Sequence, residues 1–221
     1  MIKHLFHITS ALIFCLCLLT ACGEAPIPSV PSSRQLISGR NYGERRFPVY
    51  QVSVPLGWVR RDSLPEENLS DTTKPIVEFL IPGETGHIRI SIHNFPSDTI
   101  EQRIPPAAQV ARWQRQLEGL DPSESHSIPQ AFGGFSGLGF RGVGKLNQVD
   151  TMVLGWALQI GDPHYRMLSS PSTGNPYQHR EMRADVTIKV VGPKSFMESK
   201  EEEITAFARS FELIEEIPLR S

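Results

Sequence analysis

The stretch from Met152 to Ile160 constrains the fold more than any other part of this chain. One face of it would carry Met152, Leu154, Trp156, Leu158 and Ile160, at every second position. The opposite face would carry Val153, Gly155, Ala157 and Gln159. Alternation with a period of two is typical of a β-strand. The length and apolar character of this run predict a central strand of a sheet.

Four further segments show strand patterns. They are residues 50–54, 76–81, 88–92 and 186–190. The second of these ends at Pro82 and Gly83, a common turn signal. After the central strand, the sequence Gly-Asp-Pro-His at residues 161–164 predicts a turn. We expect residues 165–169 to return antiparallel from that turn.

Two segments have the spacing of amphipathic helices. The first follows Pro105 and Pro106, which suit a first helical turn. Its apolar stripe is Val110, Trp113, Leu117 and Leu120. The second is predicted to begin at Ser199, with Glu202 completing a capping box. Its apolar stripe is Ile204, Phe207, Ala208 and Phe211.

The links between the expected strands are mostly of hairpin length, and the helices come between and after the strands. This order predicts the α+β class, an antiparallel β-sheet flanked by helices. Trp58, Trp113 and Trp156 fall where such a sheet and its helices would bury them, so we expect them to pack in the core.

The amino-terminal segment has the pattern of an export signal. Lys3 precedes an apolar run from Leu5 to Leu19, as in a secretory signal peptide. The run is nearer to about 15 residues than to the roughly 20 of a transmembrane helix. Leu19-Thr20-Ala21-Cys22 resembles the bacterial lipobox. The resemblance implies that residues 1–21 are removed and that Cys22 is acylated, with membrane lipid as its partner; the alternative is an ordinary secretory signal that contains a cysteine.

The cysteine count agrees with this interpretation. The three cysteines are Cys15, Cys17 and Cys22, so the mature chain would have no thiol besides the one to be lipidated. An internal disulfide and a cysteine metal site are both excluded. Loss of residues 1–21 removes one charged residue, Lys3, and changes the net charge from −2 to −3. A nearly neutral chain gives no indication of nucleic-acid binding.

The chain divides into three parts. Residues 1–21 are the predicted lipoprotein signal peptide. Residues 22–46 are the predicted lipidated amino terminus and a flexible tether, because proline and serine are frequent there and large apolar residues are few. Residues 47–221 are enough for one globular domain, which at this size buries roughly 70% of its unfolded surface.

Three short motifs resemble those of the PsbP-like superfamily. They are Pro-Leu-Gly-Trp at residues 55–58, Val-Gly-Pro at residues 191–193 and Ser-Phe at residues 210–211. Members of this superfamily include the photosystem II extrinsic subunit P and a nuclear factor that binds the Ran GTPase. The resemblance implies an antiparallel sheet between helices, used as a docking or assembly module and usually without catalysis. It transfers no functional residue to this chain.

Two patterns invite a chemical interpretation. Residues 137–142 fit the G-x-G-x-x-G pattern of dinucleotide sites, but no helical pattern follows, which favours a glycine-rich hairpin or bulged strand pair. His87 and His93 would lie about 20 Å apart along one strand, too far to hold one metal ion together with Glu78. We therefore predict no cofactor and no metal site.

A long connection at residues 170–183 is the candidate for partner binding. It is longer than a hairpin needs, and long connections in compact domains are often functional. Its aromatic and cationic side chains suit a protein contact. The candidate partner-binding residues are Tyr177, His179, Arg180 and Arg183.

No group of residues specifies a reaction, because the chain has no Gly-x-Ser-x-Gly elbow and its mature part has no cysteine nucleophile. We therefore expect no enzyme. We predict a lipid-anchored, periplasm-facing module of the bacterial cell envelope that binds a protein partner as an accessory or assembly factor. Gly23 and Glu24 after Cys22 lack the aspartate of an inner-membrane retention signal, which favours the outer membrane.

The alternative function is a periplasmic enzyme or small-ligand carrier. That alternative predicts a pocket of a few hundred Å³ lined by titratable residues. A binding module predicts instead an interior filled with apolar side chains.

Overall fold

The computed structural model describes residues 30–39, 48–63, 71–84, 86–97, 99–161 and 184–214. Its elements are β1 (Ser32–Ser38), β2 (Pro48–Pro55), β3 (Val59–Asp62), β4 (Val77–Gly83), β5 (Gly86–Phe95), the 3-10 helix η1 (Ile100–Gln102), α2 (Pro106–Gln114), β6 (His126–Phe132), β7 (Phe135–Leu146), β8 (Val149–Ile160), β9 (Asp185–Pro193), α5 (Lys194–Arg209) and β10 (Glu212–Leu213). A seven-stranded sheet has the order β3-β4-β5-β9-β8-β7-β6, and a three-stranded sheet has the order β1-β2-β10. Every strand pair is antiparallel.

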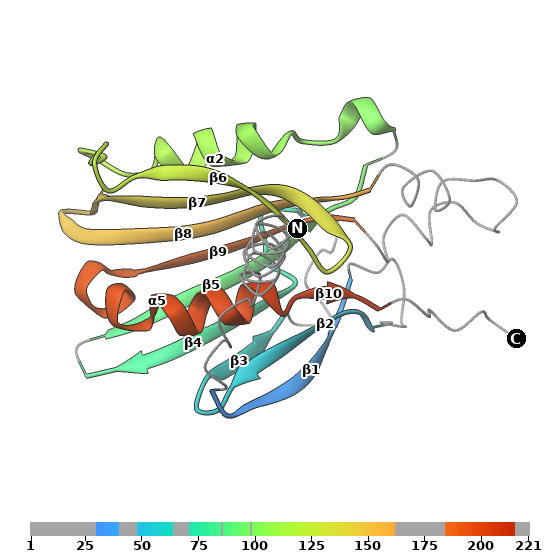
Figure 1. Cartoon of the computed structure of the whole chain (residues 1–221), viewed down its shortest axis with the longest axis horizontal. Coiled ribbons are helices and arrows are strands. Elements are labelled where there is room, and N and C mark those ends of the chain that lie inside the picture. The colour runs from blue at the N-terminus through green and yellow to red at the C-terminus, as the bar shows by residue number, and fades with distance from the viewer. Residues whose placement is uncertain are drawn as a thin grey trace, which may run out of the picture.

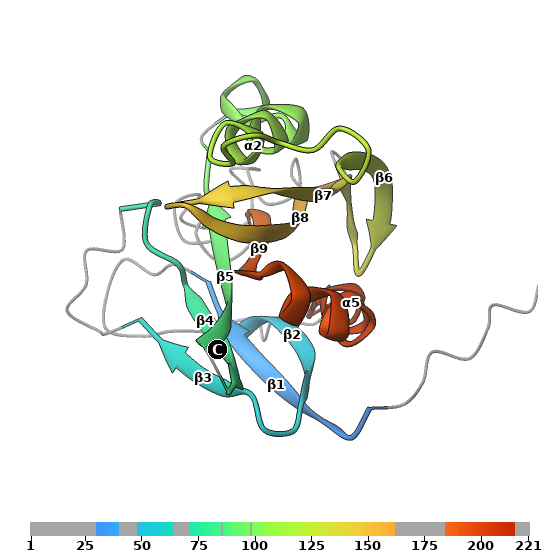
Figure 2. The same ribbon diagram turned by 90° about the vertical axis from the view of Figure 1, so that its left-hand side faces the viewer.

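Helices α2 and α5 cover opposite faces of the seven-stranded sheet (Figures 1 and 2). Helix α2 packs on β7 and β8, whereas α5 packs on β8, β9 and the neighbouring β2 of the small sheet. The predicted α+β class, an antiparallel sheet flanked by helices, is therefore confirmed.

Strand β8 is an interior strand with both faces covered. Its neighbours are β7 and β9. Leu154 and Trp156 point into the core on the α5 side, whereas Val153 and Ala157 pack with Trp113 of α2. The predicted central strand is confirmed. Residues 162–164 of the predicted turn and the returning strand predicted at residues 165–169 lie outside the described residues.

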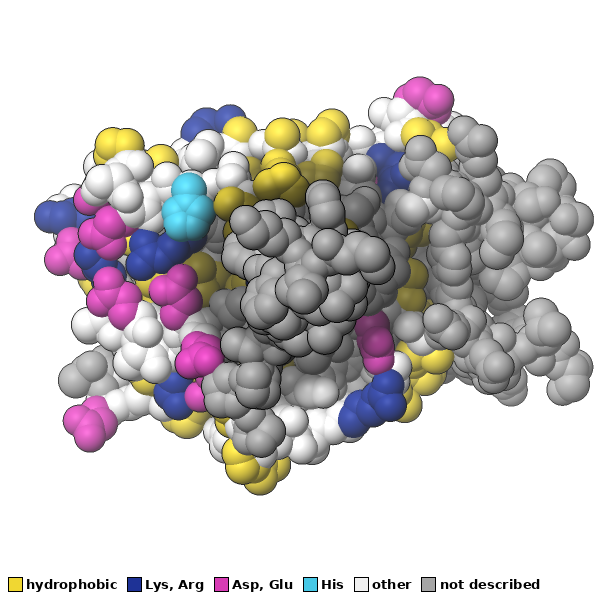
Figure 3. Space-filling model, in the orientation of Figure 1, with side chains coloured by type: hydrophobic (Ala, Val, Ile, Leu, Met, Phe, Trp, Pro, Cys, Tyr) yellow, Lys and Arg dark blue, Asp and Glu magenta, His cyan; other side chains and the backbone are white. Residues whose placement is uncertain are grey.

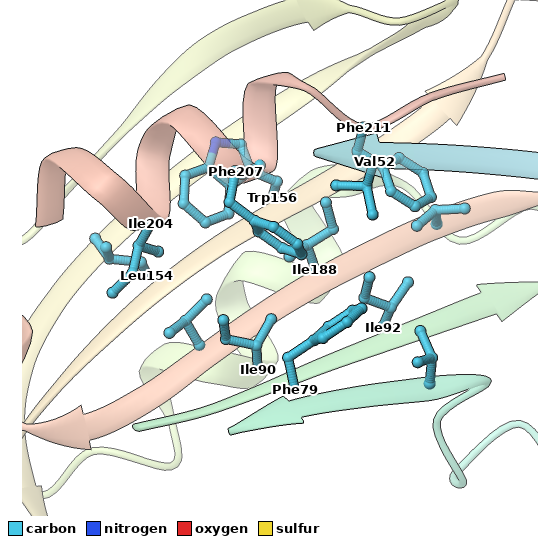
Figure 4. Close-up of a cluster of buried hydrophobic side chains, with 14 of the residues drawn as sticks. Val52, Phe79, Ile90, Ile92, Leu154, Trp156, Ile188, Ile204, Phe207 and Phe211 are labelled. Atoms are coloured by element: carbon cyan, nitrogen blue, oxygen red, sulfur yellow. The ribbon is translucent and has the colours of Figure 1, made fainter. Parts of the chain in front are cut away.

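The main core lies between the seven-stranded sheet, α5 and the small sheet (Figure 4). The sheet contributes β-branched side chains at every second position, as in Ile90, Ile92 and Ile188, each 0% exposed. Helix α5 contributes Ile204 and Phe207 from its apolar stripe. The strands predicted at residues 76–81, 88–92 and 186–190 are β4, β5 and β9, and their alternation places the apolar residues on one face of the sheet.

Helix α2 packs closely on the opposite face because β8 has a glycine beneath it. A Cβ added at Gly155 would come within 2.3 Å of Trp113 Cζ3. The predicted helix after Pro105 is confirmed, but it ends at Gln114. Leu117, predicted on its stripe, is still buried, in the turn that follows the helix. Leu120 is partly buried and packs against the cluster that Trp113 and Leu117 form with β8.

The prediction of a tether over residues 22–46 is wrong for residues 32–38. These residues form β1, which pairs with β2 in a register that places Gln35 opposite Val52. Ile37 is 1% exposed and belongs to the main core. The strand was missed because a single buried isoleucine among serines gives almost no alternation, and its stability comes from pairing with β2. The strand predicted at residues 50–54 is consequently the second strand and belongs to the small sheet.

The predicted start of the final helix at Ser199 is wrong. Helix α5 begins at Lys194, directly after Pro193. The Ser199 hydroxyl donates a hydrogen bond to the Phe196 carbonyl inside the helix, so it caps nothing. The apolar stripe therefore begins earlier, with the fully buried Met197. The predicted stripe residues Ile204, Phe207 and Ala208 lie in the helix and are buried, as expected. Phe211 is also buried, but it follows the helix.

The glycine-rich residues 137–142 lie within β7, which pairs with β6 and β8. The β6–β7 turn is made by Gly133 and Gly134, with φ of 58° and 87°. These are left-handed values that favour glycine. The predicted glycine-rich hairpin is confirmed, and the G-x-G-x-x-G pattern has no helix after it.

Candidate functional site

An open groove lies between α5 and the strands β6, β7 and β8, with a volume of about 110 Å³. Residues 126, 128 and 130 of β6 form one wall, and residues 201, 205 and 209 of α5 form the other. The floor comes from β7 and β8. The lining residues are His126, Ile128, Gln130, Gly139, Phe140, Arg141, Leu154, Trp156, Glu201, Thr205 and Arg209.

Two regular spacings build the walls. Every second residue of β6 points to the same side of the sheet, which places His126, Ile128 and Gln130 together. Residues four apart on a helix lie one above the other, which aligns Glu201, Thr205 and Arg209. The floor is apolar because Leu154 and Trp156 of β8 belong to the main core and are only 4% and 5% exposed.

One end of the groove is held by a network of ion pairs. Arg141 Nε donates to Glu201 Oε1 at 3.2 Å, and Arg141 Nη1 donates to the Glu124 carbonyl oxygen at 2.8 Å. Lys194 Nζ lies 2.7 Å from Glu124 Oε1, and this hydrogen bond raises the pKa of Lys194. Figure 3 shows charged side chains of both signs gathered over this end of α5. The charges at this end are therefore matched within the chain.

The other end of the groove carries a positive charge that no described acidic side chain pairs with. Arg209 is exposed and forms no ion pair with any residue that the structure describes. It lies in the last turn of α5, where the helix dipole favours a cation.

Strand β6 is the edge of the seven-stranded sheet, and within the described ranges it pairs with β7 alone. Ile128 on this strand is 47% exposed although it lines the groove. An exposed apolar side chain beside an apolar groove is typical of a surface that makes contacts with other molecules.

The groove combines an apolar floor with charged and hydrogen-bonding side chains. Across the described residues no three His, Cys, Asp or Glu side chains lie close enough to hold a metal ion. His87 and His93 lie on β5, and Glu78 Oε1 accepts a hydrogen bond from the Ser91 hydroxyl at 2.8 Å.

A second group of charges lies on the α2 side of the sheet. Lys189 of β9 donates a hydrogen bond to the Gln116 side-chain oxygen. Burial, together with the charges of Arg89 and Arg112, lowers the pKa of Lys189 to about 8. Three cations therefore share one part of this face.

The residues predicted as sites from the sequence lie outside the described ranges. This applies to the lipidation site Cys22 and to Tyr177, His179, Arg180 and Arg183. Sequence reasoning missed the groove because its lining comes from four separate segments of the chain. The signals that were present are the alternation His-x-Ile-x-Gln at residues 126–130 and the spacing of four between Glu201, Thr205 and Arg209.

Within the described ranges, no helix has both the length and the apolar character needed to cross a membrane.

No family model and no curated protein matches this chain. Among solved structures, LpqN of Mycobacterium tuberculosis, described as involved in cell envelope biogenesis, is similar over 82% of this chain and 91% of its own, with 13% identity and a TM-score of 0.48. Cyanobacterial PsbP from Synechocystis sp. PCC 6803 is similar over 88% of this chain and 98% of its own, with 13% identity and a TM-score of 0.44.

Proposed function

We propose that this chain is a lipid-anchored, non-catalytic module of the bacterial envelope that binds a protein partner through the groove between β6 and α5. The observation that carries the proposal is an apolar floor, formed by Leu154 and Trp156, next to a cation, Arg209, that has no counterion among the described residues. Apolar contact provides affinity, and the charge provides orientation.

The size of the groove favours a side chain over a whole small ligand. Its volume is about 110 Å³, whereas pockets for drug-sized ligands measure about 300–1,000 Å³. A cavity of about 150 Å³ holds a single benzene molecule. The groove therefore fits one large apolar side chain of a partner, and this argues against a small-ligand carrier.

The partner should present that side chain together with a carboxylate. Glu201 is engaged by Arg141, so the charge left to attract a partner is positive. Pro129 interrupts the edge of β6 and removes one backbone donor there. Side-chain insertion is therefore a better description of binding than the addition of a complete strand.

The anchor of this module is Cys22, with acyl chains that hold it to the outer membrane. Two or three chains are needed for stable attachment, since one chain binds a bilayer only marginally. We also propose that Tyr177, His179, Arg180 and Arg183, which lie outside the described residues, form a second part of the partner contact.

The test places a photoreactive amino acid at Thr205, in the groove, in the full chain in living cells. We expect one protein partner to be crosslinked. The matched control carries the same photoreactive group at the exposed Ser199 of α5, which lies outside the groove. Reversing the charge with Arg209→Glu should reduce the Thr205 crosslink several-fold, because the acidic group of the partner would be repelled.

Equal crosslinking from positions 205 and 199 would contradict a specific groove contact. Loss of the crosslink with Arg209→Glu in a chain that keeps its thermal stability would support the contact. The same photoreactive group at Tyr177 tests separately the second part of the partner contact.

A further inference from the structure

The turn between β2 and β3 presents an apolar side chain at its corner. Trp58 N donates to the Pro55 carbonyl oxygen at 3.5 Å, and Gly57 has φ of 89°. This is the geometry of a type II turn, with glycine at the position that needs a positive φ. Leu56 precedes the glycine and is 66% exposed, the highest value among the large apolar side chains of the described residues. Turn corners usually carry polar residues, so Leu56 needs an explanation.

A second exposed apolar residue lies beside this turn. Leu56 N donates to the Pro31 carbonyl oxygen at 2.9 Å, which brings Val30, 38% exposed, next to the turn. We call Val30 and Leu56 the apolar tip. Figure 3 shows hydrophobic side chains at the lower edge of the molecule, where Figure 1 places the start of β1 and the β2–β3 turn.

The tip has a firm base. The Trp58 ring packs against Phe207 of α5, with centroids 4.9 Å apart. Its Nε1 donates to Glu203 Oε1 at 2.7 Å. The turn is thus fixed to the main core, and Leu56 is directed outward by a supported backbone.

The length of chain before the tip indicates what covers it. Val30 follows the predicted lipid-bearing Cys22 by eight residues. Eight residues span at most about 28 Å when fully extended. An acylated Cys22 would therefore keep the tip within about 28 Å of the bilayer surface.

We propose that the apolar tip inserts into the interfacial region of the membrane and sets the orientation of the domain on it. This inference rests on the proposed acylation of Cys22. Apolar side chains of surface-bound proteins enter the boundary between headgroups and acyl chains. The membrane is chosen over a protein partner because the short connection holds the tip at the lipid surface.

The contact is apolar in character. Arg34 of β1 is paired with Glu212 and Arg60 of β3 with Asp62, so both cations are already neutralised by the chain. Docking of the tip should therefore need no anionic lipid and should persist in high salt, since only exposed charges are screened.

The experiment uses the full chain, purified from membranes in detergent and reconstituted into phosphatidylcholine vesicles. An environment-sensitive fluorophore is attached through Leu56→Cys, because a lipidated Cys22 leaves the mature parent without a free thiol. The matched control is Val149→Cys, which is 54% exposed at the β7–β8 turn on another edge of the molecule (Figure 1). We expect a blue shift at position 56 and several-fold stronger quenching by spin-labelled lipid than at position 149.

Equal emission and equal quenching at positions 56 and 149 would overturn the tip contact. So would protection of position 56 that occurs with added envelope proteins and not with lipid alone. Label uptake by the unsubstituted parent would show that Cys22 is not acylated, which would overturn the anchor itself. These results separate failure of the tip from failure of the anchor.

Discussion

At the scale of single residues, the most enclosed ion pair among the described residues is that of Arg103 and Asp185. Their side chains are 4% and 8% exposed. Arg103 donates to both carboxylate oxygens at 2.7 and 2.8 Å and to the Ile160 carbonyl oxygen at 2.6 Å. Ile160 N donates to Asp185 at 3.1 Å. The pair thus ties the end of β8 and the start of β9 to the segment before α2.

We predict that Asp185→Ala lowers the free energy of unfolding by about 3–5 kcal/mol, because Arg103 would remain buried without its counterion. Urea denaturation measures the change. The exposed pair of Arg34 and Glu212 provides the control, since Arg34→Ala should cost about 1 kcal/mol or less. Similar losses for the two variants would show that the buried pair has no special role.

Lys189 gives the domain a pH-dependent stability. Its pKa is about 8 in the folded chain, against 10.5 for an ordinary lysine. The folded state therefore disfavours the protonated form of Lys189. This lowers the free energy of unfolding, and the loss has its full size below pH 8. It is relieved as the pH rises from 8 to 10.5, because there the unfolded chain still binds the proton and the folded chain does not.

We predict that Lys189→Met raises the melting temperature at pH 7 by about 2–4 °C, which corresponds to about 1 kcal/mol after allowance for partial exposure. The variant should also lose the increase in stability between pH 8 and 10.5. Thermal melts across this range measure both effects, with Lys145→Met at an exposed position of β7 as the control. An unchanged pH dependence would exclude Lys189 as its source.

At the scale of elements, α2 depends on one missing side chain in β8. An alanine Cβ at position 155 would come within 2.3 Å of Trp113 Cζ3, closer than atoms can approach. Gly155→Ala should therefore displace α2 and cost about 1–3 kcal/mol, as overpacking does. Chemical denaturation measures this cost.

A double-mutant cycle gives the control for the α2 prediction. Trp113→Leu should destabilise the domain by itself, because it leaves a cavity. The double variant with Trp113→Leu and Gly155→Ala should lose less stability than the sum of the losses of the two single variants. The reason is that leucine leaves room for the new methyl group. Strict additivity would show that the ring of Trp113 is not what Gly155 accommodates.

Elements with strong internal patterns could be predicted from the sequence, and those stabilised by a neighbour could not. Strands β5, β8 and β9 alternate over their own lengths and were predicted. β1 has one buried residue, Ile37, and gains its hydrogen bonds from β2, so its own residues did not identify it. The start of α5 was misplaced because Ser199 fits a capping pattern, whereas the helix begins at Lys194, directly after Pro193.

At the scale of the whole molecule, the groove and the apolar tip occupy different parts of the surface. The groove lies between β6 and α5, and the tip lies at the start of β1 and the β2–β3 turn (Figure 1). A domain that rests on the membrane through its tip could therefore keep the groove open to a partner. The proposed anchor and the proposed contacts of the tip and the groove are thus compatible with one module that holds a partner at a bilayer.

The sequence by itself determined the α+β class, the central strand, the helix stripes and the lipobox-like segment, because each depends on residues close together along the chain. The site required the tertiary structure. His126, Arg141, Trp156 and Arg209 come from four separate elements, and no local pattern relates them. Sheet order and helix placement, which depend on long-range packing, brought them to one groove, just as chain pairing placed Leu56 beside Val30.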